Sequence, residues 1–197
     1  LSQMSGDSEA NVSEISASNG IPPLVALLAE PDEVTQLKAT MVLADMTRIS
    51  TAHSATVVKE GGLNHLLTLL TSSDSLEMKA FAADTIGSLV VEHAQLVGSS
   101  GAIQPLVALL KTDSKHAQKQ AAHALAGIAK GGQENQNGVK DAGGVELLVD
   151  LMKVNADGSA DEEVQSGAAA ALAALANSNA ANQVAITACG GIEPLIK

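Results

Sequence analysis

Histidines, one cysteine and scattered carboxylates are the residues of this 197-residue chain that could do chemistry. A metal site or an acid–base pair would need several of them at short helical spacing, as in an H-x-x-x-H pair. None of the five histidines forms such a pair: His53, His65, His93, His116 and His123. His116 and His123 share a helix face, but no Cys or carboxylate joins them at ligand spacing. We interpret the histidines as solvated or groove-lining and predict no metal site.

The single cysteine, Cys189, excludes an internal disulfide and is typical of a reducing compartment. No histidine accompanies it, so we expect a packed thiol and not a nucleophile. The chain contains no P-loop and no G-x-G-x-x-G motif. Asn11-Val12-Ser13 matches a glycosylation sequon, which we interpret as a chance match. The sequence therefore predicts no catalytic residue, no cofactor, no small-molecule ligand and no enzyme activity.

Composition narrows the class of protein and of partner. Hydrophobic residues make up 46% of the chain, but Phe81 is the only aromatic residue, which predicts a helical core of Ala, Leu, Val and Ile. The net charge of -11 argues against nucleic acid and anionic membranes as partners. The longest apolar run, 168–176, is about half of the ~20 residues that a membrane span needs. We expect a soluble intracellular protein, in the cytoplasm or in a cytoplasmic assembly.

One sequence block of the form apolar-x-x-L-(V/L)-x-L-(L/M) recurs along the chain. Four full copies occupy 21–28, 63–70, 103–110 and 145–152, and a fifth begins at Ile192. Their starts differ by 42, 40, 42 and 47 residues, and such a period is the signature of a solenoid. Ankyrin and tetratricopeptide units, at about 33 and 34 residues, are too short to fit.

Each unit predicts three helices. A short first helix ends at Gly or a Gly pair, such as Gly61-Gly62, where glycine permits a sharp turn. The block forms the second helix, and a polar turn precedes a third helix of about fifteen residues. In that helix, small and apolar residues at offsets of 3, 1 and 3 mark one buried face, as in Ala121, Ala124, Leu125 and Ile128.

This pattern resembles armadillo repeats over essentially the whole chain. HEAT repeats are the structural neighbour, but they lack the short first helix and its Gly kink. The resemblance implies an all-α, right-handed α-solenoid with three helices in each repeat of about 42 residues. We expect the end of a preceding repeat at 1–9, repeats at 10–50, 51–92, 93–131 and 132–178, and an incomplete repeat at 179–197. Neither end carries a polar capping repeat, so we expect a segment of a longer array.

The resemblance also implies that the third helices line a concave groove in which an Asn row binds the backbone of an extended partner. The residues at the Asn positions of this chain are Gln3, Asp45, Ser88, Gly127 and Ala174. Nuclear-import adaptors carry Trp one turn earlier, where this chain has Met41, Asp84, His123 and Ala170. With neither Asn nor Trp, the sequence disfavours a nuclear-import adaptor.

Charge varies along this expected groove. Residues 1–98 carry a net charge of -8 and residues 99–197 a net charge of -3. Lys115, Lys119 and His123 recur every four residues and share one helix face. Either this is a solvated face, or the groove binds a bipolar segment that is basic toward the N-terminal repeats and acidic near Lys119.

The last full unit carries an acidic insertion at 154–163, either a tolerated loop or part of a binding side. The function that the sequence favours is a non-catalytic scaffold, a subunit of a larger assembly that binds partner proteins through the groove and its flanks. The alternative is the substrate-recruiting segment of a ubiquitin ligase or of another multidomain regulatory enzyme.

Overall fold

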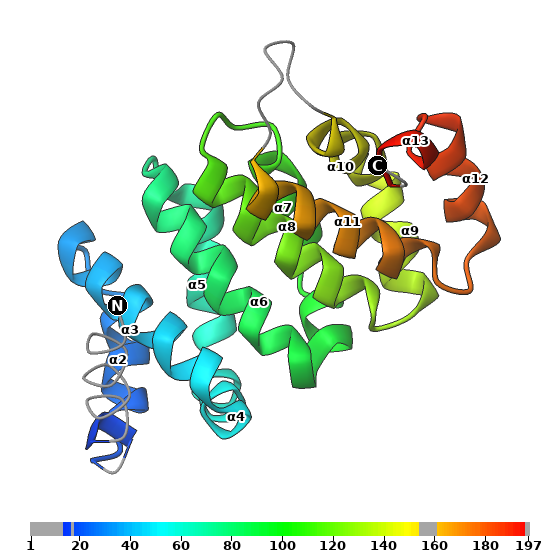
Figure 1. The fold of residues 1–197 in the computed structure, drawn as a ribbon. Coiled ribbons are helices and arrows are strands. Elements are labelled where there is room, and N and C mark those ends of the chain that lie inside the picture. The colour runs from blue at the N-terminus through cyan, green and yellow to red at the C-terminus, as the bar shows by residue number, and fades with distance from the viewer. Residues whose placement is uncertain (1–13, 17, 154–160, 196–197) are drawn as a thin grey trace.

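The structure is a computed structural model that describes residues 14–16, 18–153 and 161–195, and all regular structure in these ranges is helical (Figure 1). The helices after residues 14–16 are α2 (Ile21–Leu27), α3 (Glu33–Ile49), α4 (Thr51–Lys59), α5 (Gly62–Ser72), α6 (Leu76–Ser99), α7 (Ile103–Leu109), α8 (Lys115–Ala129), α9 (Gln133–Asp141), α10 (Gly144–Met152), α11 (Glu162–Ala176), α12 (Ala180–Ala188) and α13 (Ile192–Leu195). This arrangement confirms the predicted all-α solenoid. Within these ranges, no helix combines the length and the apolar character needed to cross a membrane.

The long third helices form one continuous layer. Helices α3, α6, α8 and α11 pack each against the next, and Figure 1 shows α6, α8 and α11 side by side. The second helices α2, α5, α7 and α10 pack against the third helices of their own units. Each unit therefore presents one long helix to its neighbours in the stack, and these helices position the residues of the expected groove.

Each long helix begins at a side-chain cap. The N-cap residues Asp32, Ser75, Ser114 and Asp161 each accept a hydrogen bond from the backbone N–H three residues on. Such a cap satisfies a backbone donor that the helix itself leaves without a partner. The polar turns of the sequence therefore fix where these four helices start.

The glycine turn between first and second helices uses two different properties of glycine. Gly61 has φ of 80°, a left-handed conformation that a side chain would strain. Gly62 leaves no room for one, because a Cβ there would lie 2.6 Å from Val57 Cγ1 and 2.9 Å from Val57 O. The predicted turn is confirmed there, but in the first unit Asn19, at φ of 54°, takes the left-handed position in place of Gly20.

Two helix boundaries show details that the sequence did not reveal. Helix α6 contains the third helix of one unit and the short first helix of the next, separated by a kink at His93 (φ -127°, ψ 30°), the first residue of the expected repeat 93–131. Helix α11 begins at Glu162, so the last two residues of the expected insertion form its first turn and Asp161 is its N-cap. Residues 154–160 of the insertion lie outside the described residues.

The core is aliphatic. Leu, Ile, Val, Ala and Met fill it, whereas Phe81 is only half-buried and lies edge-on to the His116 ring at a centroid distance of 5.3 Å. The expected core composition is therefore confirmed, and the single aromatic ring lies at its margin. Small side chains let the third helices approach closely, which affects the shape of the groove surface that these helices form.

Candidate partner-binding groove

The third helices enclose a hollow of about 390 Å³, which we call the central hollow. Its lining residues come from α3, α6 and α8: Arg48, Asp84, Gly87, Ser88, Lys119, Gln120 and His123. Four of these were expected in the groove from the sequence, namely Asp84, Ser88, Lys119 and His123. The structure therefore brings together residues from two different predicted repeats.

Two glycines lie where α6 and α8 pack together beside this hollow. A Cβ on Gly127 would collide with Val90 Cγ2, whereas a Cβ on Gly87 would lie 3.6 Å from the Cα of Ala124, which is an ordinary contact distance. The Val90 side chain of α6 therefore fits against α8 because residue 127 has no Cβ. Gly127 occupies an expected Asn position, and in this packing a side chain there would require Val90 to move.

Two ion pairs link the third helices across the groove. The Arg48 guanidinium contacts Asp84 Oδ2 at 2.6 Å and Asp45 Oδ1 at 2.9 Å, so it connects α3 with α6. Lys119 Nζ contacts Glu163 Oε2 at 2.7 Å and connects α8 with α11. Sequence reasoning missed Arg48 and Glu163 as groove residues. The i, i+3 spacing of Asp45 and Arg48 was the only signal that could have pointed to Arg48.

The charges of these ion pairs shift the pKa values of Arg48 and His123. Burial disfavours the charged guanidinium, but Asp84 and Asp45 more than offset this and raise the pKa of Arg48. Burial and the nearby Lys119 ammonium lower the pKa of His123, with Asp84 and Glu163 acting in the opposite direction. The His123 ring in the groove is therefore harder to protonate than a free imidazole.

A second hollow of about 700 Å³, the C-terminal hollow, follows where α11 and α12 meet α8 and α9. The expected groove residues Ala170 and Ala174 line it together with Lys130. Gln136 Nε2 donates to the carbonyls of Ala174 (2.9 Å) and Asn177 (3.1 Å), and so satisfies the end of α11. Side chains of the protein already bind these backbone acceptors, and Lys130 is the one charged residue among the described residues that line this hollow.

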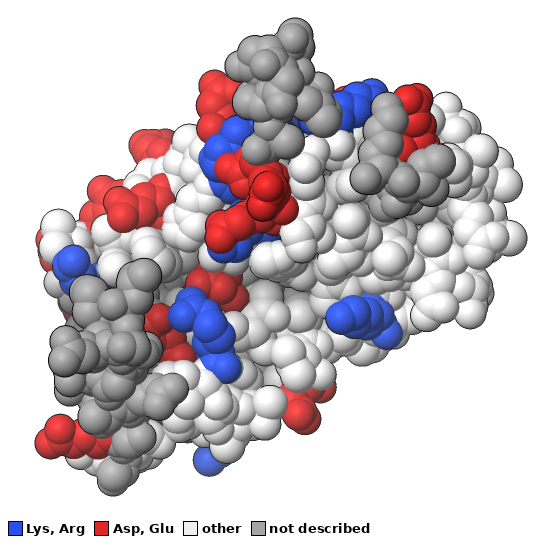
Figure 2. Space-filling model, in the orientation of Figure 1, with Lys and Arg blue, Asp and Glu red and all other residues white. Residues whose placement is uncertain are grey.

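The other expected groove residues lie outside the two hollows. Met41 is half-buried on α3, Asp45 is held by Arg48, and Lys115 is exposed and donates to Gln118 Oε1 at 3.1 Å. Gln3, like Asn11-Val12-Ser13, lies outside the described residues. On the face in Figure 2, acidic and basic residues lie beside each other over α3, α6 and the start of α11. A broad uncharged area covers α11 and α12.

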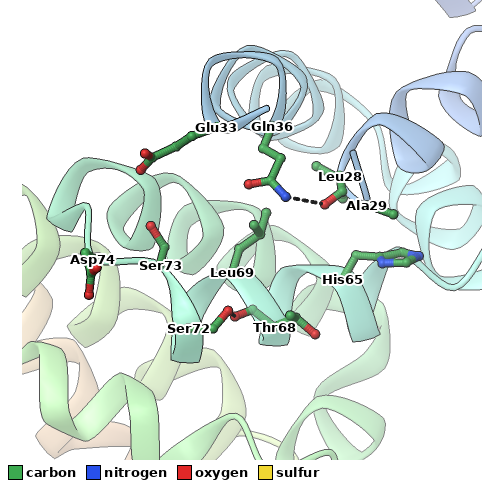
Figure 3. A pocket seen from close by; sticks show the side chains of 10 residues that line it. All are labelled: Leu28, Ala29, Glu33, Gln36, His65, Thr68, Leu69, Ser72, Ser73 and Asp74. Carbon is green, nitrogen blue, oxygen red and sulfur yellow. Dashed lines mark hydrogen bonds between the residues drawn. The ribbon is translucent and has the colours of Figure 1, made fainter. Parts of the chain in front are cut away.

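A third hollow of about 500 Å³ lies at the edge of the array, between the α2–α3 turn and α5 (Figure 3). Glu33 and Asp74 stand at its rim, and Gln36 Nε2 donates to the Leu28 carbonyl at 3.2 Å. The hydroxyls of Thr68 and Ser72 are bonded to carbonyls of their own helix. Because its polar groups serve the fold, we assign no binding role to this edge pocket.

Two histidines are not solvated or groove-lining as expected, and this interpretation is wrong for His53 and His93. His53 lies 2.9 Å from the Met46 carbonyl through Nδ1 and 2.8 Å from Ser16 Oγ through Nε2. His93 is partly buried at the kink of α6. Both occupy a junction between a third helix and the following first helix, ten residues before a block start. His65 lines the edge pocket.

Cys189 is partly exposed and packs against the core at the end of α12. Burial and the neighbouring Glu146, which also accepts a hydrogen bond, raise the pKa of its thiol. A raised pKa disfavours the thiolate, which is the nucleophilic form. Among the described residues, no group of three His, Cys, Asp or Glu residues could hold a metal ion.

Comparison with known proteins agrees with this geometry. Residues 91–130 and 134–176 match the family model of the armadillo/beta-catenin-like repeat. The chain belongs to the armadillo-repeat family. The first matched range ends with α8 and the second ends at the last residue of α11, so each match includes a groove-lining third helix.

One curated relative matches about two thirds of the chain. The chain is 31% identical to Vacuolar protein 8 of Candida albicans over 131 residues, which are 66% of this chain and 22% of that protein. It therefore spans about a fifth of that relative.

Two solved structures of non-natural proteins are also similar. An engineered protein is 37% identical, with a TM-score of 0.80 over 90% of this chain and 70% of the other. A designed armadillo repeat protein in complex with the peptide (KR)4 is 27% identical, with a TM-score of 0.81 over 93% of this chain and 75% of the other. The armadillo fold of this chain is in general a protein-binding scaffold and is typically non-catalytic.

Proposed function

We propose that this chain is a non-catalytic scaffold that holds an extended segment of a partner protein along its third helices. The central hollow carries this proposal, because residues from three successive third helices converge there on one polar depression. A concave surface built from stacked repeats suits an extended ligand that contacts several repeats at once. We further propose that the scaffold works as a subunit of a larger assembly.

The charges of the groove specify which kind of segment it binds. Asp45 and Asp84 lie on α3 and α6, and Lys119 follows on α8, so a bound segment is basic toward the N-terminal repeats and acidic near Lys119. The designed armadillo protein that binds (KR)4 supports a basic ligand for such a groove. In this chain, the Arg48–Asp84 and Lys119–Glu163 ion pairs already neutralise part of the acidic and the basic charge of the groove.

The affinity must come from shape and charge. No Asn occupies the described Asn positions, and each neutral hydrogen bond to a peptide backbone is worth about 0.5–1.5 kcal/mol. The large aromatic anchors that dominate many interfaces are also missing from the sequence. We therefore expect modest affinity and a marked dependence on salt, because exposed charge pairs are screened.

Fluorescence anisotropy with labelled (KR)4 peptide tests the basic half of this proposal. Asp84→Asn removes the carboxylate of the central hollow and is expected to weaken binding about three- to tenfold. An acidic peptide, (DE)4, tests the other half, and Lys119→Glu is expected to abolish its weaker binding by placing like charges together. Thermal melts establish that each variant is folded.

Lys59→Glu is the matched control, because Lys59 is an exposed cation of the first helix α4 and lies outside both hollows. It is expected to leave the binding of (DE)4 nearly unchanged. If Asp84→Asn and Lys119→Glu bind both peptides as tightly as the unmodified protein does, the third-helix groove is not the binding site.

A further inference from the structure

Arg48 pairs with Asp84, the one carboxylate among the described residues that line the central hollow. The Asp84 side chain is only 14% exposed, whereas the Arg48 side chain that pairs with it is 54% exposed. Asp84 is therefore the inner member of the pair and Arg48 the outer one, nearer to solvent. A partner's basic side chain would have to approach Asp84 from that same solvent side.

Asp84 needs a cation in this place. Removing a carboxylate from water is costly unless a positive charge or several hydrogen bonds compensate for it. In the structure, Arg48 supplies the charge and reaches Asp84 from the neighbouring unit, 36 residues away along the chain. A segment that bound at Asp84 would have to supply the cation in its turn.

Arg48 has a second carboxylate partner besides Asp84. Arg48 makes its second contact with Asp45, which is on its own helix and whose side chain is 48% exposed. It can therefore leave Asp84 and keep a carboxylate partner. Because the Arg48 side chain is half exposed, water and salt compete for its charge and weaken the pair.

We propose that Arg48 is an internal competitor that holds the place of a partner's arginine at Asp84 and must be displaced when a basic segment binds. This inference rests on the proposed function of the groove. It also names the chemistry of the occupant: the contact that Arg48 makes shows that a guanidinium fits against Asp84. An arginine can present two nitrogens to the Asp84 carboxylate, whereas the single ammonium of lysine matches it less well.

The test measures (KR)4 binding by anisotropy in four proteins: unmodified, Arg48→Gln, Asp84→Asn and the double variant. Removing the competitor is expected to tighten (KR)4 binding about two- to fivefold, the range of an exposed ion pair. In the Asp84→Asn background, the same substitution is expected to have a smaller effect, because there is no carboxylate to release. An (RR)4 peptide is expected to gain more than (KK)4 from Arg48→Gln.

Lys130→Gln is the matched control for charge alone. Lys130 is an exposed cation that lines the neighbouring C-terminal hollow, so its removal changes the net charge of the groove by the same amount. Arg48→Gln is expected to exceed this control. Arg48 also links two helices, so a second variant, Arg48→Lys, keeps the positive charge but loses the planar guanidinium. Its affinity for (KR)4 is expected to lie between those of the unmodified protein and Arg48→Gln.

The outcomes separate this inference from the proposed function. If (KR)4 binds neither the unmodified protein nor Arg48→Gln, the proposed basic groove is wrong. If (KR)4 binds and Asp84→Asn weakens it, but Arg48→Gln leaves binding equal, reduced or raised only as much as Lys130→Gln does, the groove stands and the competitor is overturned. An equal gain in both backgrounds also overturns it.

Discussion

Cys189 lies among carboxylates at the end of α12. Burial and Glu146 raise the pKa of the thiol, Asp150 adds to this, and Lys153 opposes it. The thiolate fraction at neutral pH is therefore below that of a free cysteine, although the residue is partly exposed. The Cys189 thiol is partly accessible but is a poor nucleophile, which agrees with a packing role.

This environment predicts slow alkylation. At pH 8, Cys189 is expected to react with iodoacetamide more slowly than a free thiol, and Glu146→Gln is expected to raise the rate because it removes a negative charge and changes the hydrogen bond. Mass spectrometry of time-quenched samples gives the rates. Glu77→Gln, a distant substitution in the first turn of α6, serves as the control. An unchanged rate in Glu146→Gln would contradict this account of the thiol.

Single residues of the groove were predictable where one helix contains the whole signal. The four-residue spacing of Lys119 and His123 placed them on one face, and the central hollow contains both. Arg48 and Glu163 were not found, because their partners are 36 and 44 residues away and belong to other units. Periodicity within a helix reveals a face, but it does not reveal which charges meet between helices.

The third helix of one unit and the first helix of the next meet at a polar junction that recurs along the array. At the third position of three first helices, a side chain reaches back to a carbonyl seven residues earlier: His53 to Met46, Asn135 to Ile128 and Asn182 to Leu175. Asn135 and Asn182 also donate to a carbonyl of the preceding unit. The junction therefore satisfies the end of a third helix and joins neighbouring units.

His93 differs from the asparagines of this set. Its buried Nε2 has no hydrogen-bond partner among the described residues, which is also true of Asn182 Oδ1, and it lies at the kink inside α6. A buried polar atom without a partner costs about 1–3 kcal/mol. Asparagine would remove the ring nitrogen and offer an amide donor, which reaches a carbonyl at the equivalent positions 135 and 182.

We therefore predict that His93→Asn stabilises the protein by about 1 kcal/mol in urea unfolding monitored by circular dichroism. His53→Asn is the comparison, because both ring nitrogens of His53 already have partners and its replacement should give no gain. A loss of stability in His93→Asn would show that the imidazole is required at the kink.

The elements themselves were largely predictable from local chemistry. The N-caps and the glycine turns reproduce the three-helix unit, because each acts within a few residues. The direct junction of two helices at the His93 kink of α6 was not predicted, since no glycine or proline marks it in the sequence. Residues 162–163 were assigned to a loop because their acidity suits a loop as well as a first helical turn.

The whole molecule is a stack in which each unit contacts its neighbours. The pairs α3 with α6, α6 with α8, and α8 with α11 connect the array from one end of the described part to the other. In such an array, stability is approximately a sum of unit and nearest-neighbour contributions. Units between two neighbours are held on both sides, and units near either end of the described part have fewer contacts.

A cluster of buried amide side chains at α9, α11 and α12 allows this nearest-neighbour description of stability to be tested. Asn182 is fully buried and donates to the carbonyls of Leu175 and Gln136, and Asn179 donates to Gln136 Oε1 at 3.0 Å. Asn182→Ala leaves two buried carbonyls without this donor, which we expect to cost about 1–3 kcal/mol. The loss should appear in α11 and α12 and should fade toward α6.

Native-state hydrogen exchange measures this gradient directly. In Asn182→Ala, the opening free energy of amides in α11 and α12 is expected to fall by about 1–3 kcal/mol, while that of amides in α6 changes little. Gln183→Ala removes an exposed hydrogen bond to Ala176 next to the same site, and it should have a much smaller effect. An equal loss of protection in every helix would mean that the array unfolds as one cooperative unit, since each opening would then require the unfolding of all the others.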